Sequence, residues 1–211
     1  MMRKEVWGLR KKELDLLKRL NTPSKIQDFL NSLKMNFEEK GDTCRSPRMV
    51  LLQREAHCME AAMLAAAALR FQGYPPLVVD LEADGKDDDH VIAVFKKNGF
   101  WGAVSKTNYP CLRYREPVYK SVRELVMSFF HEYFVNATGR KTLRKYSLPL
   151  DLSRFDQERW MTLEGDVWFV PEYLADVKHY PVLTKSQLRG LRRVDDIEIQ
   201  ASSLREWKPG K

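Results

Sequence analysis

Residues 54–62, which read REAHCMEAA, are the stretch that decides the fold. They lead into a helix predicted from about Gln53 to Gln72, with Cys58 in its first turn. Ala62 and Ala65 share the face of Cys58, so the helix can pack closely against a sheet. A cysteine there lies at the positive end of the helix dipole, beside free N–H groups that lower its pKa. The pattern predicts a reactive thiolate, with a small buried hydrophobic cysteine as the competing interpretation.

Downstream of this helix, the sequence predicts an antiparallel hairpin. A short apolar strand spans residues 77–81 and is followed by the charged loop 82–89. His90 then opens a second strand that reads HVIAVF. Asn98-Gly99 marks the hairpin turn, and the return strand spans residues 100–107. A histidine that opens a strand beside charged residues is a candidate general acid or base, with a surface histidine as the competing interpretation.

The length of the hairpin loop decides which residue faces His90. A four-residue loop over 96–99 pairs Ser105 directly with His90. A two-residue Asn98-Gly99 loop pairs Thr107 with His90 and makes Ser105 its diagonal neighbour. In both registers the three side chains share one face, because side chains alternate along a strand. A three-residue loop would instead turn Ser105 away.

The order of these motifs resembles the core of the transglutaminase-like superfamily. Residues 57–62 read HCMEAA, residues 73–79 read GYPPLVV, His90 opens the next strand, and residues 101–104 read WGAV. In that family a cysteine opens a helix, a Gly-Xaa-Pro turn leads into a strand, a histidine opens the next strand, and an aspartate follows a tryptophan-containing strand. The match covers residues 53–108, about a quarter of the chain. The resemblance implies a papain-like fold and acyl transfer through a cysteine thioester.

The resemblance assigns Cys58 as the nucleophile and His90 as its proton-transfer partner, but it fails at the third position. Ser105 stands where the family has an aspartate. A serine can accept a hydrogen bond from the histidine and fix its tautomer, but it carries no negative charge. Asn108 is an alternative orienter if the strand ends or bulges before it, and Asp88-Asp89 in the preceding loop is another. The last alternative is a degenerate site that binds without catalysis.

Four further residues are candidates for substrate recognition. Gln53, just before the cysteine helix, is a candidate oxyanion donor, with an exposed helix-start glutamine as the competing interpretation. Tyr109, Arg113 and Arg115 follow the return strand in a proline-bounded loop and could form a substrate wall. In the competing interpretation, the tyrosine packs and the arginines pair with Glu116 or face solvent.

We expect one domain of the α+β class over residues 1–211. Its transglutaminase-like core spans residues 20–119, with the cysteine helix packed on an antiparallel sheet and helices on the flanks. Residues 120–211 are expected to form a mostly helical extension of the same domain. Residues 1–20 predict a basic amphipathic helix that docks on the body of the protein, and they lack the apolar run of a signal peptide.

The composition argues against disulfide, metal and membrane-binding sites. The 211 residues include 3 cysteines, without a Cys-Xaa-Xaa-Cys pair. Neither a disulfide framework nor a metal site is predicted, and no cofactor is expected. Reduced thiols are typical of a cytoplasmic location. No apolar run approaches the length of a membrane span, so no membrane partner is expected.

The leading functional hypothesis is an enzyme that acts on an amide or peptide carbonyl through a thioester, with hydrolysis favoured over transfer to an amine. Its partner would be a protein or peptide substrate, or a small amide. The first alternative is a catalytically degenerate binding protein on the same fold. The net charge of +7 invites a second alternative, a basic nucleic-acid-associated module, although the basic residues are dispersed and form no nucleic-acid motif.

Overall fold

The computed structural model describes residues 7–210. The predicted docking helix over 1–20 begins outside the described residues, and within them α1 spans Lys11–Arg19. Leu17 of α1 is buried in the main core. Glu13 forms a buried ion pair with Arg48, with 2.7 Å between Oε1 and Nε. These contacts hold α1 against the body of the protein.

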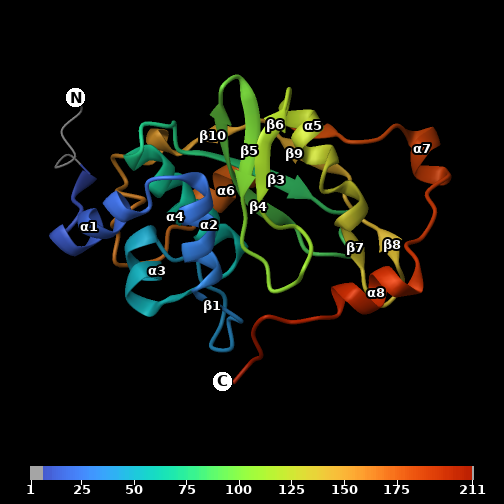
Figure 1. Cartoon of the computed structure of the whole chain (residues 1–211), viewed down its shortest axis with the longest axis horizontal. Helices are drawn as coiled ribbons and strands as arrows, with labels where there is room; N and C mark the ends of the chain where they lie inside the picture. Colours follow the sequence, from blue (N-terminus) through green and yellow to red (C-terminus); the bar gives the residue numbers. More distant parts are fainter. Residues whose placement is uncertain (1–6, 211) are drawn as a thin grey trace.

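A seven-stranded antiparallel sheet forms the centre of the molecule (Figure 1). Its strands follow the order β11-β9-β3-β4-β5-β6, and β10 pairs with β3 beside that path. Two small sheets, β1 with β2 and β7 with β8, lie outside it. The strands are β1 Lys34–Met35, β2 Glu55–Ala56, β3 Leu77–Glu82, β4 His90–Lys97, β5 Phe100–Val104, β6 Arg115–Tyr119, β7 Phe134–Val135, β8 Arg140–Lys141, β9 Lys145–Ser147, β10 Leu150–Asp151 and β11 His179–Pro181.

Helices α1 to α4 gather on one side of the sheet, and α7 and α8 lie on the other side with β7 and β8 (Figure 1). Thr22 caps α2 and Ser46 caps α3, and each is followed by a proline in the first helical turn, as helix starts favour. The remaining helices are α2 Pro23–Asn31, α3 Pro47–Gln53, α4 Cys58–Phe71, α5 Val122–Met127, α6 Phe169–Asp176, α7 Lys185–Arg189 and α8 Asp196–Ser202, with short 3-10 helices at Phe130–Glu132 and Leu152–Phe155.

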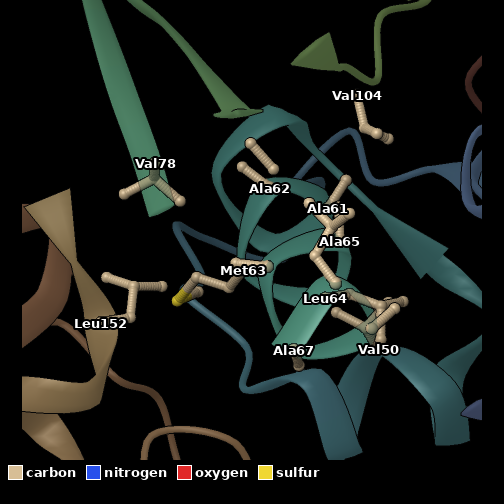
Figure 2. Packing of buried hydrophobic residues seen from close by; sticks show 14 of the residues in the cluster. Val50, Ala61, Ala62, Met63, Leu64, Ala65, Ala67, Val78, Val104 and Leu152 are labelled. Carbon is tan, nitrogen blue, oxygen red and sulfur yellow. The ribbon is translucent and has the colours of Figure 1, made fainter. Parts of the chain in front are cut away.

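The sheet buries a hydrophobic layer on each face. Along β4, Ala93 faces the layer built around α4, whereas Ile92 faces the layer that contains α5. Helix α4 is buried on nearly all sides, and Met63 extends from it toward Val78 and Leu152 (Figure 2). Close packing on all sides leaves α4 little freedom to shift, so the position of its first residue is fixed by the core.

The helix predicted from about Gln53 to Gln72 begins later than expected, at Cys58, and Gln53 belongs to the preceding helix. Helix α3 ends at Gln53, because Arg54 adopts a left-handed conformation with φ of 61°. Helix α4 then begins at Cys58. The break moves Cys58 from within the first turn to the first position of its helix.

The hairpin takes the two-residue register. Lys97 pairs with Phe100. Asn98 and Gly99 have φ of 51° and 87°, as a type I′ turn requires. Strand β5 ends at Val104, before the end of the predicted return strand. Ser105 is therefore free to leave the strand ladder and take other partners.

Residues 120–211 contribute more β-structure than we predicted. Strands β9, β10 and β11 all join the central sheet, so the expected mostly helical extension missed part of it. Each has only two or three residues, which is too short for a hydrophobic pattern to mark. The fold is a mixed arrangement of helices around an antiparallel sheet. Among the helices of residues 7–210, none combines the length and apolarity needed to cross a membrane.

Candidate active site

Cys58 is the first residue of α4, and local bonds fix the helix start there. The backbone N–H of His57, which caps α4, donates to Glu60 Oε2 at 3.1 Å. The first N–H groups of a helix have no intrahelical acceptor, so the N–H of Cys58 is a candidate oxyanion donor. Cys58 is half-buried and borders a cavity of about 390 Å³. This cavity therefore gives a small reagent a route to Cys58.

His90 opens β4 and borders the same cavity. Its Nε2 lies 2.8 Å from Ser105 Oγ. The Ser105 hydroxyl donates its one proton to the carbonyl of Leu112 at 2.6 Å, so it accepts from His90. Nε2 therefore carries a proton, and Nδ1 is the ring nitrogen left to take a proton from the Cys58 thiol at the same cavity. Ser105 thus fixes the tautomer that a proton acceptor for Cys58 needs.

Two histidines act on the Cys58 thiol. Burial alone raises the pKa of Cys58, but hydrogen bonds and charge attraction from His57 and His90 outweigh burial and lower it to about 5. Burial alone lowers the pKa of His57, but its hydrogen bond to Cys58 and the charges of Cys58 and Glu60 raise it to about 9. At neutral pH the site therefore holds a thiolate beside an imidazolium.

His57 is held in place by acceptors. Its Nε2 donates to the carbonyl of Thr43 at 2.9 Å. The same nitrogen lies 3.6 Å from Glu60 Oε1 and 3.7 Å from Glu38 Oε1. Because a carbonyl can only accept, Nε2 is protonated, and the nearby carboxylates favour the charged ring. His57 is thereby kept cationic next to the nucleophile.

Glu60 organises the residues around the start of α4. Its side chain is fully buried. Its two carboxylate oxygens accept from Asn36 Nδ2 at 3.1 Å, Thr43 Oγ1 at 2.8 Å, the Arg45 N–H at 3.0 Å and the His57 N–H at 3.1 Å. A buried carboxylate is tolerated only when it has such partners. Through these bonds Glu60 positions both His57 and the loop that His57 contacts.

Helix α2 fixes the backbone around Ser105. Gln27 Nε2 donates to the Ser105 carbonyl at 2.7 Å, and Gln27 Oε1 accepts from the Ser105 N–H at 2.9 Å. Lys106 Nζ donates to the carbonyls of Leu30 and Leu33 at 3.0 and 2.7 Å, at the C-terminal end of α2. Burial lowers the pKa of Lys106 to about 8. These bonds replace strand pairing beyond the end of β5 and hold Ser105 toward His90.

Leu112 carries backbone strain next to Ser105. Its φ of 57° is left-handed, which costs an L-residue about 1–2 kcal/mol. Its N–H donates to Glu132 Oε2 at 2.7 Å, while its carbonyl accepts from Ser105. Arg115 in turn pairs with Glu132 at 2.6 Å. Arg115, which we predicted in a substrate wall, instead helps to position Leu112 and so Ser105.

Asn108 and the acidic loop do not replace the missing carboxylate. The Asn108 side chain bonds the backbone of Trp207, with Nδ2 3.0 Å from its carbonyl. Asp89 accepts from the backbone N–H of Ala83 at 2.7 Å, and Asp88 is exposed. Asn108 turns away because the chain leaves the sheet after β5. The orienting partner of His90 in the described residues is therefore Ser105.

Tyr109 and Gln53, which we also predicted to bind substrate, border different cavities. Tyr109 borders the Cys58 cavity, and its carbonyl accepts from Arg113 Nε at 2.8 Å. Gln53 is exposed at the end of α3 and borders a separate cavity of about 510 Å³. The break at Arg54 separates Gln53 from the start of α4, so it is not placed to stabilise an oxyanion at Cys58.

Four residues of the site were not predicted from the sequence: His57, Glu60, Gln27 and Lys106. His57 and Glu60 carried a local signal, because they have the spacing of a capping box around Cys58. Gln27 and Lys106 carried none, since their partners lie on distant segments. Within residues 7–210, no group of three or more histidine, cysteine, aspartate or glutamate side chains is placed to hold a metal ion.

Comparison with known proteins does not assign this chain to a family. No family model matches this chain, and no curated protein matches it. The functional argument therefore rests on the geometry of Cys58, His90 and their partners.

Replacing Ser105 by alanine tests its orienting role. Ser105→Ala leaves the His90 Nε2–H without an acceptor and frees the ring to turn, so the Cys58 thiolate loses a fixed partner. We expect the midpoint of the pH profile of Cys58 alkylation by iodoacetamide to rise by about one pH unit, the equivalent of one buried hydrogen bond. Ser105→Thr retains the hydroxyl and should keep a midpoint close to that of wild type. Equal midpoints for Ser105→Ala and the matched control Thr107→Ala would contradict the assignment.

Proposed function

We propose that the protein is a thiol acyl-transfer enzyme of transglutaminase-like, papain-like architecture that acts on an amide or peptide carbonyl. One observation carries the proposal. Cys58 begins a buried helix and borders the same cavity as His90, while Ser105 fixes the tautomer of that histidine. Nucleophilic catalysis typically uses a nucleophile, a base beside it, and a third group that orients the base.

The reaction begins with attack of the Cys58 thiolate on the carbonyl carbon. A C–S bond forms, and the N–H of Cys58 stabilises the oxyanion. The C–N bond then breaks as His90 Nδ1–H gives its proton to the leaving amine, which leaves a thioester on Cys58. Water gives a proton to His90 Nδ1 and attacks the thioester. The C–S bond breaks, the acid leaves, and the thiolate and the protonated His90 are restored.

Ser105 in place of a carboxylate changes how the ion pair is supported. A serine supplies no negative charge to stabilise the protonated His90, and in a serine protease the loss of that charge costs about 10⁴ in turnover. A cysteine depends less on it, because its thiolate forms before the substrate arrives. His57, held cationic beside Cys58, adds a second source of thiolate stabilisation. We infer that this second imidazole compensates in part for the missing carboxylate.

Hydrolysis is the favoured outcome, because water is the acceptor present at every site that is open to solvent. The cavity of about 390 Å³ lies within the range of small-ligand sites and accepts a side chain or a short peptide segment. The second candidate function is a binding protein, which Ser105 favours because it lacks the acid. The two candidates differ in whether the Cys58 thioester turns over.

Turnover of p-nitrophenyl acetate separates these candidates. We expect wild-type protein to release a burst of nitrophenolate followed by steady turnover. Cys58→Ala should lose both phases, and Cys111→Ala, a matched cysteine at the same cavity, should keep both. His90→Gln should keep a burst, since this leaving group needs no proton, and slow the steady phase by about 10²–10⁴. Equal release by Cys58→Ala and wild type would refute the proposal, and a burst without turnover in wild type would favour the binding protein.

A further inference from the structure

The C-terminal strap, residues 204–208, lies along the loop that follows β5. It comes directly after α8 and runs toward β1 (Figure 1). Four of its five residues are exposed, and Leu204 keeps 68% of its surface in contact with solvent. The strap is therefore held by specific contacts and not by burial in the core.

Asn108 binds the backbone of this strap. Its Nδ2 donates to the Trp207 carbonyl at 3.0 Å, and its Oδ1 accepts from the Trp207 N–H at 2.7 Å. The Asn108 carbonyl also accepts from the Glu206 N–H at 3.1 Å. Asn108 thus forms hydrogen bonds with three backbone groups of an extended segment, as the exposed sheet edge of a peptide-binding domain does. None of these bonds depends on the side chains of the strap.

Two side-chain contacts add selectivity. Arg113 Nη2 pairs with Glu206 Oε2 at 2.9 Å, with 30% and 32% of the two side chains exposed. The Arg205 guanidinium stacks over the Tyr109 ring, 4.1 Å from its centre. Partly exposed contacts of this kind are individually weak. The pair with Arg113 favours an acidic residue at that position of the strap, but the two contacts together stabilise the docked strap only weakly.

The strap lies between two cavities. Arg205 borders the cavity that contains Cys58 and His90, whereas Trp207 and Lys208 border the separate cavity of about 510 Å³. Met35 borders both. The two cavities are therefore neighbours, and the strap forms a wall of each.

The docked strap also leaves a polar group unsatisfied. The indole Nε1 of Trp207 is buried and has no hydrogen-bond partner among the described residues. A buried donor without an acceptor opposes the docked state. Weak side-chain contacts together with this penalty are properties of a segment that opens locally without unfolding the domain.

We propose that Asn108 and Arg113 form a binding site for an extended polypeptide with an acidic residue opposite Arg113, and that the strap occupies this site as an intramolecular competitor. A polypeptide bound in place of the strap lies in a groove that borders both cavities, including the one that contains Cys58. The role of this groove in substrate delivery rests on the proposed acyl-transfer function. Peptide binding itself does not, because it needs neither the thiol nor His90.

The test uses the full-length chain and a fluorescein-labelled peptide with the sequence of residues 203–209. Glu206→Arg places like charges opposite Arg113 and weakens the docking of the strap, so this variant should bind the peptide about fivefold more tightly than wild type, by fluorescence anisotropy. Glu172→Arg, the same charge change at an exposed position of α6, should bind like wild type.

A charge swap identifies Arg113 as the selective contact. Glu206→Arg combined with Arg113→Glu should lose affinity for the peptide, and a peptide with arginine in place of glutamate should lose affinity for the Glu206→Arg chain. Peptide binding that is equal in wild type and Glu206→Arg, or equal for the two peptides, would overturn the proposal.

The strap and the proposed function are tested separately. Glu206→Arg should also raise the rate of Cys58 alkylation by a bulky maleimide about fivefold, because the cavity opens. Peptide binding should persist in Cys58→Ala if the groove exists, whether or not the enzyme turns over an ester. Turnover without peptide binding would refute the groove alone, and peptide binding without turnover would refute the acyl-transfer function alone.

Discussion

Iodoacetamide is expected to alkylate Cys58 at a rate that stays constant from about pH 8 down to about pH 6 and falls by half near pH 5. The reactive species is the thiolate, and the two histidines lower the pKa of Cys58 to about 5. The fraction of thiolate therefore rises through about pH 5 and is nearly complete at pH 6. An ordinary thiol, with a pKa of about 8.5, is less than about 1% ionised at pH 6.

The shape of this profile is more informative than the rate at neutral pH. A thiolate of low pKa is intrinsically less nucleophilic, by about half a logarithmic unit per pKa unit. The advantage of Cys58 over N-acetylcysteine should consequently be small at pH 7 and about five- to tenfold at pH 6. Mass spectrometry of each cysteine-containing peptide over the pH range measures both quantities.

The other cysteines and the two histidines provide the controls. Burial raises the pKa of Cys44 to about 12 and also raises the pKa of Cys111, so neither should react appreciably below pH 7. His57→Gln and His90→Gln should each shift the Cys58 midpoint upward by about one to two pH units. A Cys58 profile that rises only near pH 8.5, as for an unperturbed thiol, would contradict the ion pair.

Removal of Glu60 is expected to have the largest effect on stability. Glu60→Ala leaves four donors without the buried carboxylate that accepts from them, including the N–H of His57. The cost should be about 3–5 kcal/mol in the free energy of unfolding, as for a buried charge network that loses one member. Urea unfolding followed by circular dichroism measures it.

Glu55 is the matched control for Glu60. It pairs with Arg45 at 2.8 Å, but a third of its side chain is exposed, so Glu55→Ala should cost less than about 1 kcal/mol. Glu60→Gln, which keeps one acceptor oxygen, should lie between the two and provides a folded protein if the alanine variant does not fold. Equal costs for Glu60→Ala and Glu55→Ala would show that the buried network does not organise the start of α4.

The parts of the fold with strong local signals were predictable from the sequence. Asn98-Gly99 requires a tight turn, and this turn allowed the register that makes Ser105 the diagonal neighbour of His90. The break before Cys58 was not predictable, because Arg54 takes a left-handed conformation that usually needs glycine or asparagine. Strand β9 was missed because its three residues are specified by the edge they pair with and not by their own pattern.

The residues of the candidate site also fall into two groups, those that the sequence predicts and those that only the fold reveals. Cys58 and His90 follow from helix-start and strand-start positions, and Ser105 follows from hairpin geometry. The role expected for Asn108 failed because the chain leaves the sheet after Val104 and turns the Asn108 side chain to the C-terminal strap. Gln27 reaches Ser105 from a helix 78 positions earlier in the chain, a contact that only the tertiary fold reveals.

The most direct test of a working Cys58–His90 pair is to locate the acyl group during turnover. Full-length protein is mixed with p-nitrophenyl acetate, quenched in acid, and analysed by intact mass and peptide mapping. We predict one acetyl group on Cys58, sensitive to hydroxylamine, that is transient in wild type and accumulates toward one per chain in His90→Gln, because removal of the thioester needs His90 as base. The absence of acetyl on Cys58, or equal labelling of Cys58 and Cys111, would contradict the account.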